Sequence, residues 1–123
     1  MKTIKVSGPV IIKDNKVLLI KDIKDAFWKY PGGKVESGES LEQTCIREAK
    51  EELAIDVFNL KHLTTITSQK DETTKVELVH YLTDYSGEIV KGLDIIEWDW
   101  FDINNLPDNC APNIMPVIEE YLK

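Results

Sequence analysis

The spacing of hydrophobic and polar positions along the chain predicts a series of strands interrupted by helices. Apolar or alternating runs over residues 5–13 and 17–21 predict two strands, which Asp14-Asn15 joins as a hairpin turn. Similar runs predict four more strands, over residues 60–67, 75–83, 87–90 and 97–103. The polar segment 68–74 separates two of these strands, and we expect it to form a solvated hairpin tip.

Two segments have helical rather than strand spacing. Between residues 41 and 53 the apolar positions recur at helical intervals, which predicts an amphipathic helix. Ser40 followed by Gln43 is typical of a capping box, so we expect this helix to begin directly after Ser40. A second helix is predicted over residues 116–122, with Pro116 near its start. Strands and helices that interleave without a repeat predict an α/β layered fold.

Composition is consistent with a single domain, residues 1–123, built around one core. The chain has 42% hydrophobic residues, no apolar run long enough to span a membrane, and no long apolar region of the secretory type at its start. We therefore expect a cytoplasmic protein. The net charge of −7 repels nucleic acid polymers on average. Cys45 and Cys110 form neither a metal-binding pair nor a disulfide framework, so both are expected to be reduced, with Cys45 buried.

Three glutamates crowd one stripe of the predicted first helix. Glu48, Glu51 and Glu52 stand three and four positions apart, so their side chains project to neighbouring sides of that stripe. Like charges at this spacing repel by roughly 0.2–0.5 kcal/mol per exposed pair, and the fold gains nothing from clustering them. A hard cation would reverse the sign, and Mg²⁺ takes oxygen ligands from a few carboxylates and from substrate phosphates. The stripe therefore predicts a site for Mg²⁺, with Mn²⁺ as the alternative, that holds a diphosphate.

A glycine-rich turn, Pro31-Gly32-Gly33, precedes the acidic helix and gives a backbone that can approach a ligand closely. The last glycine is followed by five residues, Glu39, seven residues, and the run Arg47-Glu-Ala-Lys-Glu-Glu. This spacing resembles the Nudix box of the MutT-like pyrophosphohydrolases, and every charged position of the box is present. The one departure is Ala54, where the family has a glycine at the helix C-terminal turn. We expect it to alter local geometry rather than chemistry.

The resemblance to the Nudix family implies an α/β/α sandwich with a mixed central β-sheet, extending over the whole chain. It also implies metal-assisted hydrolysis, with Glu48, Glu51 and Glu52 as metal ligands. Glu48 or a neighbouring carboxylate would deprotonate the attacking water. Arg47 and Glu39 match the pair that, in relatives, joins the loop to the helix and orients the catalytic glutamate.

Two further metal ligands are implied outside the helix. The carbonyl group of Gly32 lies where relatives contribute a backbone ligand. Glu97, directly before Trp98, resembles the downstream acidic residue that completes the metal site in MutT-like members, although strand glutamates more often face solvent. Asp94 and Asp99 are weaker candidates.

Three kinds of side chain are candidates for binding the substrate. Lys34 follows the double glycine, where its ammonium group either neutralises a phosphate or only adds solubility. Trp28 precedes the loop, and Trp98 and Trp100 share one face of a strand; these rings either stack a nucleotide base or, as is commoner for paired aromatics, pack the core. Asn113 resembles the MutT asparagine that contacts a guanine-type base, but here one extra residue separates it from the next proline. The alternative is a helix N-cap.

The reaction expected from the resemblance is hydrolysis of a nucleoside diphosphate linked to another group. An ordinary or oxidised nucleoside triphosphate, giving a monophosphate and pyrophosphate, is the leading substrate because the tail resembles MutT. Dinucleoside polyphosphates, nucleotide sugars and ADP-ribose stay open. The ADP-ribose hydrolases of the family commonly carry a proline not far beyond the box, and this chain has none between Pro31 and Pro107, which lowers the rank of ADP-ribose. A non-catalytic nucleotide-binding module is the rival, which the retained glutamates disfavour. We expect a monomer or homodimer that binds a small-molecule nucleotide as its substrate. We expect it to bind neither a nucleic acid polymer nor a membrane.

Overall fold

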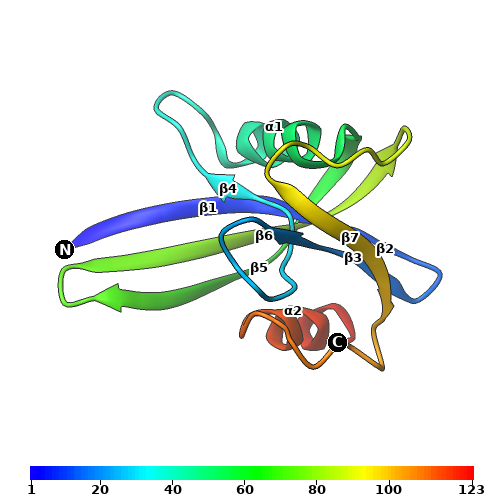
Figure 1. Cartoon of the computed structure of the whole chain (residues 1–123). Helices are drawn as coiled ribbons and strands as arrows, with labels where there is room; N and C mark the ends of the chain where they lie inside the picture. Colours follow the sequence, from blue (N-terminus) through cyan, green and yellow to red (C-terminus); the bar gives the residue numbers. More distant parts are fainter.

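The computed structural model describes residues 1–123 and places two helices on opposite faces of a layer of strands (Figure 1). Helix α1 (Leu41–Leu53) covers one face and helix α2 (Ile114–Tyr121) covers the other. The strands are β1 (Lys2–Val10), β2 (Ile12–Lys13), β3 (Lys16–Asp22), β4 (Gly33–Lys34), β5 (Asp56–Asp71), β6 (Thr74–Ser86) and β7 (Ile95–Asp102). The expected α/β/α arrangement is confirmed.

The strands form two sheets that meet where β1 passes into β2. The larger sheet has the order β4-β1-β6-β5, and it is mixed because β1 runs parallel to β6 while its other pairings are antiparallel. The smaller sheet, β2-β3-β7, is antiparallel. One strand was predicted over residues 5–13, but the structure interrupts it at Ile11, whose carbonyl accepts a hydrogen bond from the backbone of Leu18 across the hairpin at 3.0 Å.

Some of the predicted turns and strand ends agree with the structure and others do not. Asp14 and Asn15 form the expected hairpin turn, and both have positive φ angles of 52° and 62°, as the tightest hairpin turns require. The tip predicted over residues 68–74 is far shorter, because β5 and β6 continue into it and only two residues remain as a turn. The strand predicted over 87–90 is wrong, since this segment is irregular. Helix α2 starts at Ile114, two residues before the predicted start.

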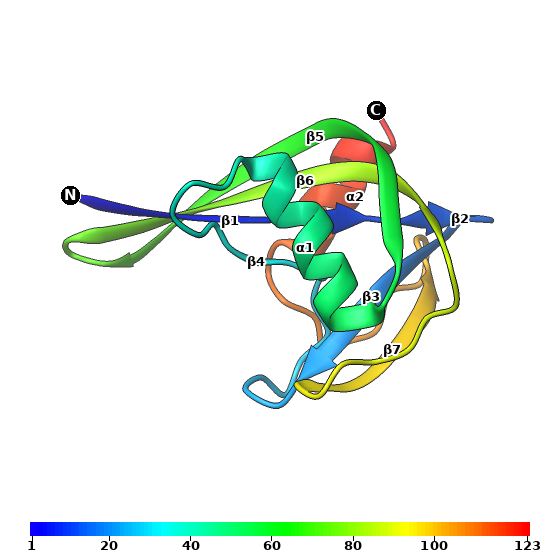
Figure 2. The same cartoon turned by 90° about the horizontal axis from the view of Figure 1, so that it is seen from above.

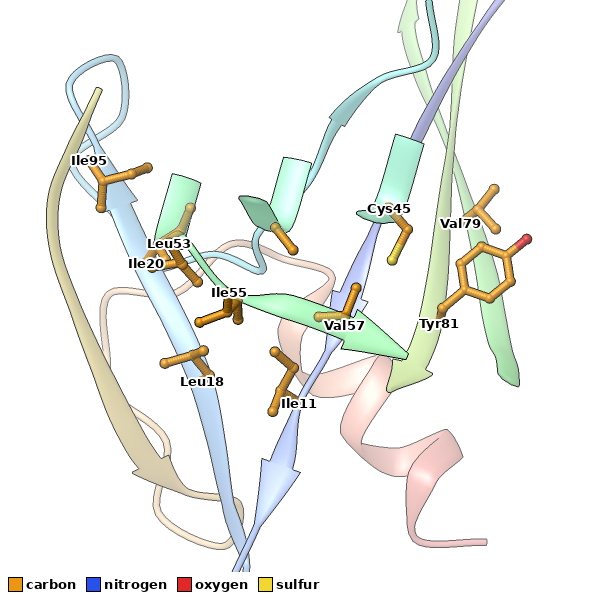
Figure 3. Close-up of a cluster of buried hydrophobic side chains, with 11 residues drawn as sticks. Ile11, Leu18, Ile20, Cys45, Leu53, Ile55, Val57, Val79, Tyr81 and Ile95 are labelled. Carbon is orange, nitrogen blue, oxygen red and sulfur yellow. The ribbon is translucent and has the colours of Figure 1, made fainter. Parts of the chain in front are cut away.

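Hydrophobic side chains fill the space on each side of the strands, so the core has two parts. The part beneath α1 joins the helix to β3, β5 and β6 (Figure 3). Trp98 and Trp100 pack against it, which supports core packing for this pair. Cys45 is fully buried there as expected, and burial raises the pKa of its thiol to about 12. The second part of the core lies beneath α2. Neither helix is long and apolar enough to cross a membrane.

Candidate active site

Helix α1 begins where its sequence predicts. Ser40 Oγ accepts a hydrogen bond from the Gln43 amide at 3.1 Å, and Gln43 Oε1 accepts one from the Ser40 amide at 2.8 Å, which completes the capping box. At the other end Ala54 has left-handed backbone angles, φ 60° and ψ 24°, and its N–H donates to the Lys50 carbonyl. The two caps define the helix whose last two turns carry the acidic stripe.

Arg47 is the centre of the polar contacts on this helix. Its guanidinium donates to both carboxylate oxygens of Glu39, at 2.6 and 3.0 Å, and to Glu48 Oε1 at 2.9 Å. A further N–H donates to the backbone carbonyl of Lys34 at 3.1 Å. The bidentate contact with Arg47 holds the pKa of Glu39 down to about 2, so this carboxylate stays ionised. The loop after the double glycine is therefore tied to the helix through one side chain.

Glu48 and Glu52 face a cavity next to the glycine loop. Glu52 Oε1 accepts the Gly32 amide proton at 2.8 Å, and burial, with help from the charges of Glu48 and Asp22, raises the pKa of Glu52 to about 8. Burial also raises the pKa of Glu48. A Cβ at Gly33 would lie 2.3 Å from Glu48 Oε1, so any other residue there would displace the Glu48 carboxylate.

Glu51 differs from these two glutamates. Its side chain is 59% exposed and lies 3.3 Å from the Arg47 guanidinium. In the conformation described, no three acidic, histidine or cysteine side chains converge on one point. The contacts explain why: Arg47 draws Glu48 and Glu51 to itself, whereas the Gly32 amide holds Glu52.

The donor chemistry of this cluster fits a divalent cation. Carboxylate oxygens and the Gly32 carbonyl are hard ligands of the kind that Mg²⁺ and Mn²⁺ bind. Glu48 and Glu52 are packed where burial disfavours their charged forms, and a cation would offset that cost.

Glu48 and Glu52, but not Glu51, line a cavity of about 560 Å³, here called the carboxylate cavity. Its lining includes Gly32, Glu48, Glu52, Asp22 and Asp94. Glu97 does not line it: the Glu97 carboxylate is 54% exposed and lies 3.6 Å from Lys21 Nζ. The structure thus brings Asp94, the weaker sequence candidate, nearer to the acidic helix.

A second cavity, about 240 Å³, lies on the α2 side of the large sheet and is called here the sheet cavity. Half of its lining is hydrophobic. The lining residues are Val6, Gly8, Phe27, Lys29, Tyr30, Pro31, Gly32, Leu78, Val79, His80, Ala111 and Asn113. Lys29 and Gly32 line both cavities, so the two adjoin at the glycine loop.

Asn113 brings a polar group to the sheet cavity. It stands at the N-cap position of α2, but its side chain makes no capping hydrogen bond. Instead its amide nitrogen lies 3.3 Å from His80 Nε2. Burial lowers the pKa of His80 to about 4, so the ring is neutral at pH 7 and packs edge-on against Tyr30. The Tyr30 hydroxyl donates to the Ile114 carbonyl at 2.9 Å, which fixes the start of α2 beside the cavity.

The two remaining substrate candidates are placed differently. Lys34 lines the carboxylate cavity. Trp28 is buried in the core beneath α2, with its ring 4.7 Å from that of Phe101, and it lines neither cavity. Sequence reasoning missed Lys29, whose ammonium group contacts Asp22 and Asp25. Its place just ahead of the glycine turn was the only available signal.

Comparison with known proteins identifies the family of this chain. The model of the NUDIX domain family matches residues 1–121. The chain belongs to the Nudix family. As a Nudix hydrolase it acts on pyrophosphate bonds, in agreement with the acidic helix.

Individual relatives of this Nudix hydrolase have different substrates in their names. The ADP-ribose pyrophosphatase of Methanocaldococcus jannaschii is 36% identical over 120 residues, covering 93% of this chain and 70% of the relative. The 8-oxo-dGTP diphosphatase of Proteus vulgaris is 29% identical over 89 residues, covering 69% of this chain and 80% of the relative. The crystal structure of a MutT NUDIX hydrolase from Burkholderia pseudomallei superposes with a TM-score of 0.88, at 25% identity and 98% coverage of both chains.

Proposed function

We propose that this Nudix hydrolase is a divalent-metal-dependent nucleotide pyrophosphohydrolase that binds its substrate across the two adjoining cavities. The nucleoside occupies the half-hydrophobic sheet cavity, and the diphosphate lies over the carboxylate cavity. The observation that carries the proposal is that Lys29 and Gly32 line both spaces. A nucleotide has the same arrangement as the two cavities, because its largely apolar base and sugar are joined directly to its charged phosphates.

The residues of the chain divide the chemistry among themselves. A bound Mg²⁺ or Mn²⁺, held by Glu48, Glu51, Glu52 and the Gly32 carbonyl, would offset phosphate charge and acidify the attacking water. Glu48 accepts the proton of that water, and Arg47 holds the Glu48 carboxylate in position at 2.9 Å. Glu39 fixes Arg47 in turn.

Lys24, Lys29 and Lys34 are the basic residues that line the carboxylate cavity, and of these Lys29 and Lys34 offset the negative charge of the phosphates. Lys34 stands on β4, directly after the glycine loop, and lines the carboxylate cavity but not the sheet cavity. Lys29 lies at the junction, where a phosphate next to the nucleoside would be placed. In the sheet cavity the Asn113 amide is positioned to read the edge of a base.

A nucleoside triphosphate, ordinary or oxidised, is the proposed substrate, with a nucleoside monophosphate and pyrophosphate as products. The 8-oxo-dGTP diphosphatase relative and the MutT superposition support this choice, as does Asn113 in the sheet cavity. ADP-ribose is the second candidate, since the relative that carries its name is 36% identical over nearly the whole chain.

Product analysis separates the candidates. The purified chain is incubated with Mg²⁺ and a panel of ordinary and oxidised nucleoside triphosphates, ADP-ribose, nucleotide sugars and dinucleoside polyphosphates, and products are resolved by anion-exchange chromatography. Pyrophosphate with a monophosphate indicates the first candidate, and AMP with ribose 5-phosphate indicates the second. Glu52→Gln should lower turnover at least about 100-fold. Glu42→Gln, on the exposed first turn of the same helix, should leave turnover unchanged.

Two results would count against the proposal. Nucleotide binding without turnover of any substrate, in a folded protein, would favour the non-catalytic binding module. Turnover that persists in chelator, or in Glu52→Gln, would contradict the assignment of the metal helix. Asn113→Ala tests the sheet cavity separately, because it should raise KM for nucleotides while the affinity for Mg²⁺ stays the same.

A further inference from the structure

Thr44 is a fully buried polar residue near the start of α1. The helix lies over β1, and the loop that follows β4 leads into it (Figure 2). Thr44 Oγ1 lies 2.7 Å from Glu39 Oε1 and 3.1 Å from the carbonyl oxygen of Ser40. Both neighbouring oxygens are acceptors, so the Thr44 hydroxyl is the donor, and its one proton goes to the nearer, charged oxygen. The hydroxyl therefore binds a carboxylate that lies outside the helix.

The Glu39 carboxylate accepts hydrogen bonds on both of its oxygens. Oε1 accepts from Thr44, from the Glu36 amide at 3.0 Å and from Arg47 Nη2 at 3.0 Å, and Oε2 accepts from Arg47 Nε at 2.6 Å. The Glu36 amide belongs to an exposed loop, whereas Thr44 is fully buried and its branched side chain has few rotamers in a helix. Thr44 is therefore the rigid contact that sets the plane of the Glu39 carboxylate.

The orientation of Arg47 decides which carboxylate its remaining nitrogen binds. The guanidinium is planar and rigid, so the bonds from Nε and Nη2 to Glu39 fix the direction of Nη1. Nη1 lies 2.9 Å from Glu48, 3.3 Å from Glu51 and 3.6 Å from Glu36. Because these distances are similar, the choice of partner depends on how firmly Glu39 holds the guanidinium.

The position of α1 does not depend on the Thr44 hydroxyl. The capping box closes the first turn, and the fully buried Ser7 of β1 donates to the Leu41 carbonyl at 2.6 Å. These contacts anchor the start of the helix through other groups. Loss of the hydroxyl should then free the carboxylate that it binds and leave the helix in place.

We propose that Thr44 is a positioning residue for hydrolysis, acting through Glu39 and Arg47. Its buried hydroxyl orients Glu39, which orients the guanidinium so that Nη1 binds Glu48 rather than the two competing carboxylates. The inference rests on the proposed function, in which Glu48 accepts the proton of the attacking water. Thr44 lines neither the carboxylate cavity nor the sheet cavity, so its effect belongs in kcat rather than in KM.

Variants with and without the hydroxyl test this role in turnover of the fastest substrate of the panel with Mg²⁺. Thr44→Val keeps the shape of the side chain and should lower kcat roughly tenfold, with KM within about twofold of wild type. Thr44→Ala, which suits a helix better, should show the same loss, and Thr44→Ser should restore kcat to within about threefold. Thr83→Val is the matched control, because Thr83 is also buried but its hydroxyl has no hydrogen-bond partner. Wild-type kcat in both hydroxyl-free variants, or an equal loss in Thr44→Ser, would overturn the proposal.

A double-mutant cycle tests the route through Glu39. In a Glu39→Gln background, Thr44→Val should lower kcat by less than a further factor of about two. An undiminished loss in that background would contradict the route. Glu48→Gln separates this inference from the proposed function. Wild-type turnover by Glu48→Gln would refute the proposed base and the role of Thr44 with it. An inactive Glu48→Gln beside an unimpaired Thr44→Val would refute the role of Thr44 alone.

Arg47 also gives a readout that needs no turnover, because it is the only arginine in the chain. In the metal-free protein its Nε–H, which donates to Glu39, should give one NMR signal that exchanges slowly with water. Thr44→Val should speed this exchange at least about fivefold, and Thr44→Ser should not. A merely structural role would lower the free energy of unfolding and leave the signal unchanged, so unchanged exchange in Thr44→Val would overturn the positioning role.

Discussion

Replacing Ala54 with glycine should stabilise this Nudix hydrolase. Ala54 ends α1 in the left-handed region, at φ 60° and ψ 24°, where the Cβ of an L-residue crowds the following carbonyl group. The side chain is exposed, so removing its methyl group leaves no cavity. The substitution therefore isolates the backbone conformation at the one position where the chain departs from the Nudix box.

The size of the effect follows from two opposing terms. Relief of the left-handed conformation is worth roughly 1–2 kcal/mol. The greater freedom of glycine in the unfolded chain costs about 0.5–1 kcal/mol of this gain. We expect the free energy of unfolding to rise by about 0.5–1 kcal/mol, which for a chain of this length raises Tm by about 2–5 °C.

Urea unfolding, followed by far-UV circular dichroism, measures this difference directly. The midpoint should rise with an unchanged m-value, because the surface exposed on unfolding is the same. Ala26→Gly is the matched control: Ala26 is also exposed but has no positive φ, so glycine there should destabilise. Turnover by Ala54→Gly should stay within about twofold of wild type, since Arg47 and the Gly32 amide position the glutamates. A glycine variant that is less stable than wild type would refute the strain argument.

Three more outcomes are expected. Arg47→Lys should lower kcat about 10- to 100-fold with little change in KM, because a lysine cannot reproduce the contacts to Glu39 and Glu48. A rise in KM as large as the fall in kcat would contradict a positioning role. His80 has a folded pKa of about 4 against 6.5 when unfolded, so unfolding takes up protons and stability falls as pH drops from 6.5 to 4, by about 3 kcal/mol. Urea titrations at pH 7 and pH 4 should show this loss for wild type and a smaller one for His80→Gln. Asp94→Asn should raise the Mg²⁺ concentration for half-maximal turnover more than Glu97→Gln does; the reverse order would restore Glu97 as the downstream ligand.

Local signals predicted parts of this fold well, because the forces that form those parts act over a few residues. The capping box of Ser40 and Gln43 placed the start of α1 correctly, and Asp14-Asn15 placed the first hairpin. The polar segment 68–74 misled for the same reason. Its residues resemble a loop, yet β6 supplies a pairing partner for most of them and the edge position lets them face water.

The candidate site was predictable only in part. The glutamates of α1 and their arginine lie within a dozen residues of each other, so spacing alone brought them together. The sheet cavity instead combines four segments that are far apart in the sequence: β1 and β6, which pair in parallel, the glycine loop, and the start of α2, which Tyr30 holds by a hydrogen bond. Nothing in the local pattern around Val6, His80 or Lys29 indicates that they share a cavity.

The segment 87–95 shows how stability and site geometry depend on the same backbone. The last carbonyl groups of a helix need donors from elsewhere, and here the Val90 amide donates to Leu53 and the Gly92 amide to Glu52. A side chain at Gly92 would collide with the Glu51 carbonyl, so this close approach requires glycine. A strand over 87–90 would direct the Val90 amide to a neighbouring strand instead of to Leu53, which is consistent with the absence of the predicted strand. By binding the end of α1, the segment also carries Asp94 to the wall of the carboxylate cavity, which Glu48 and Glu52 line as well.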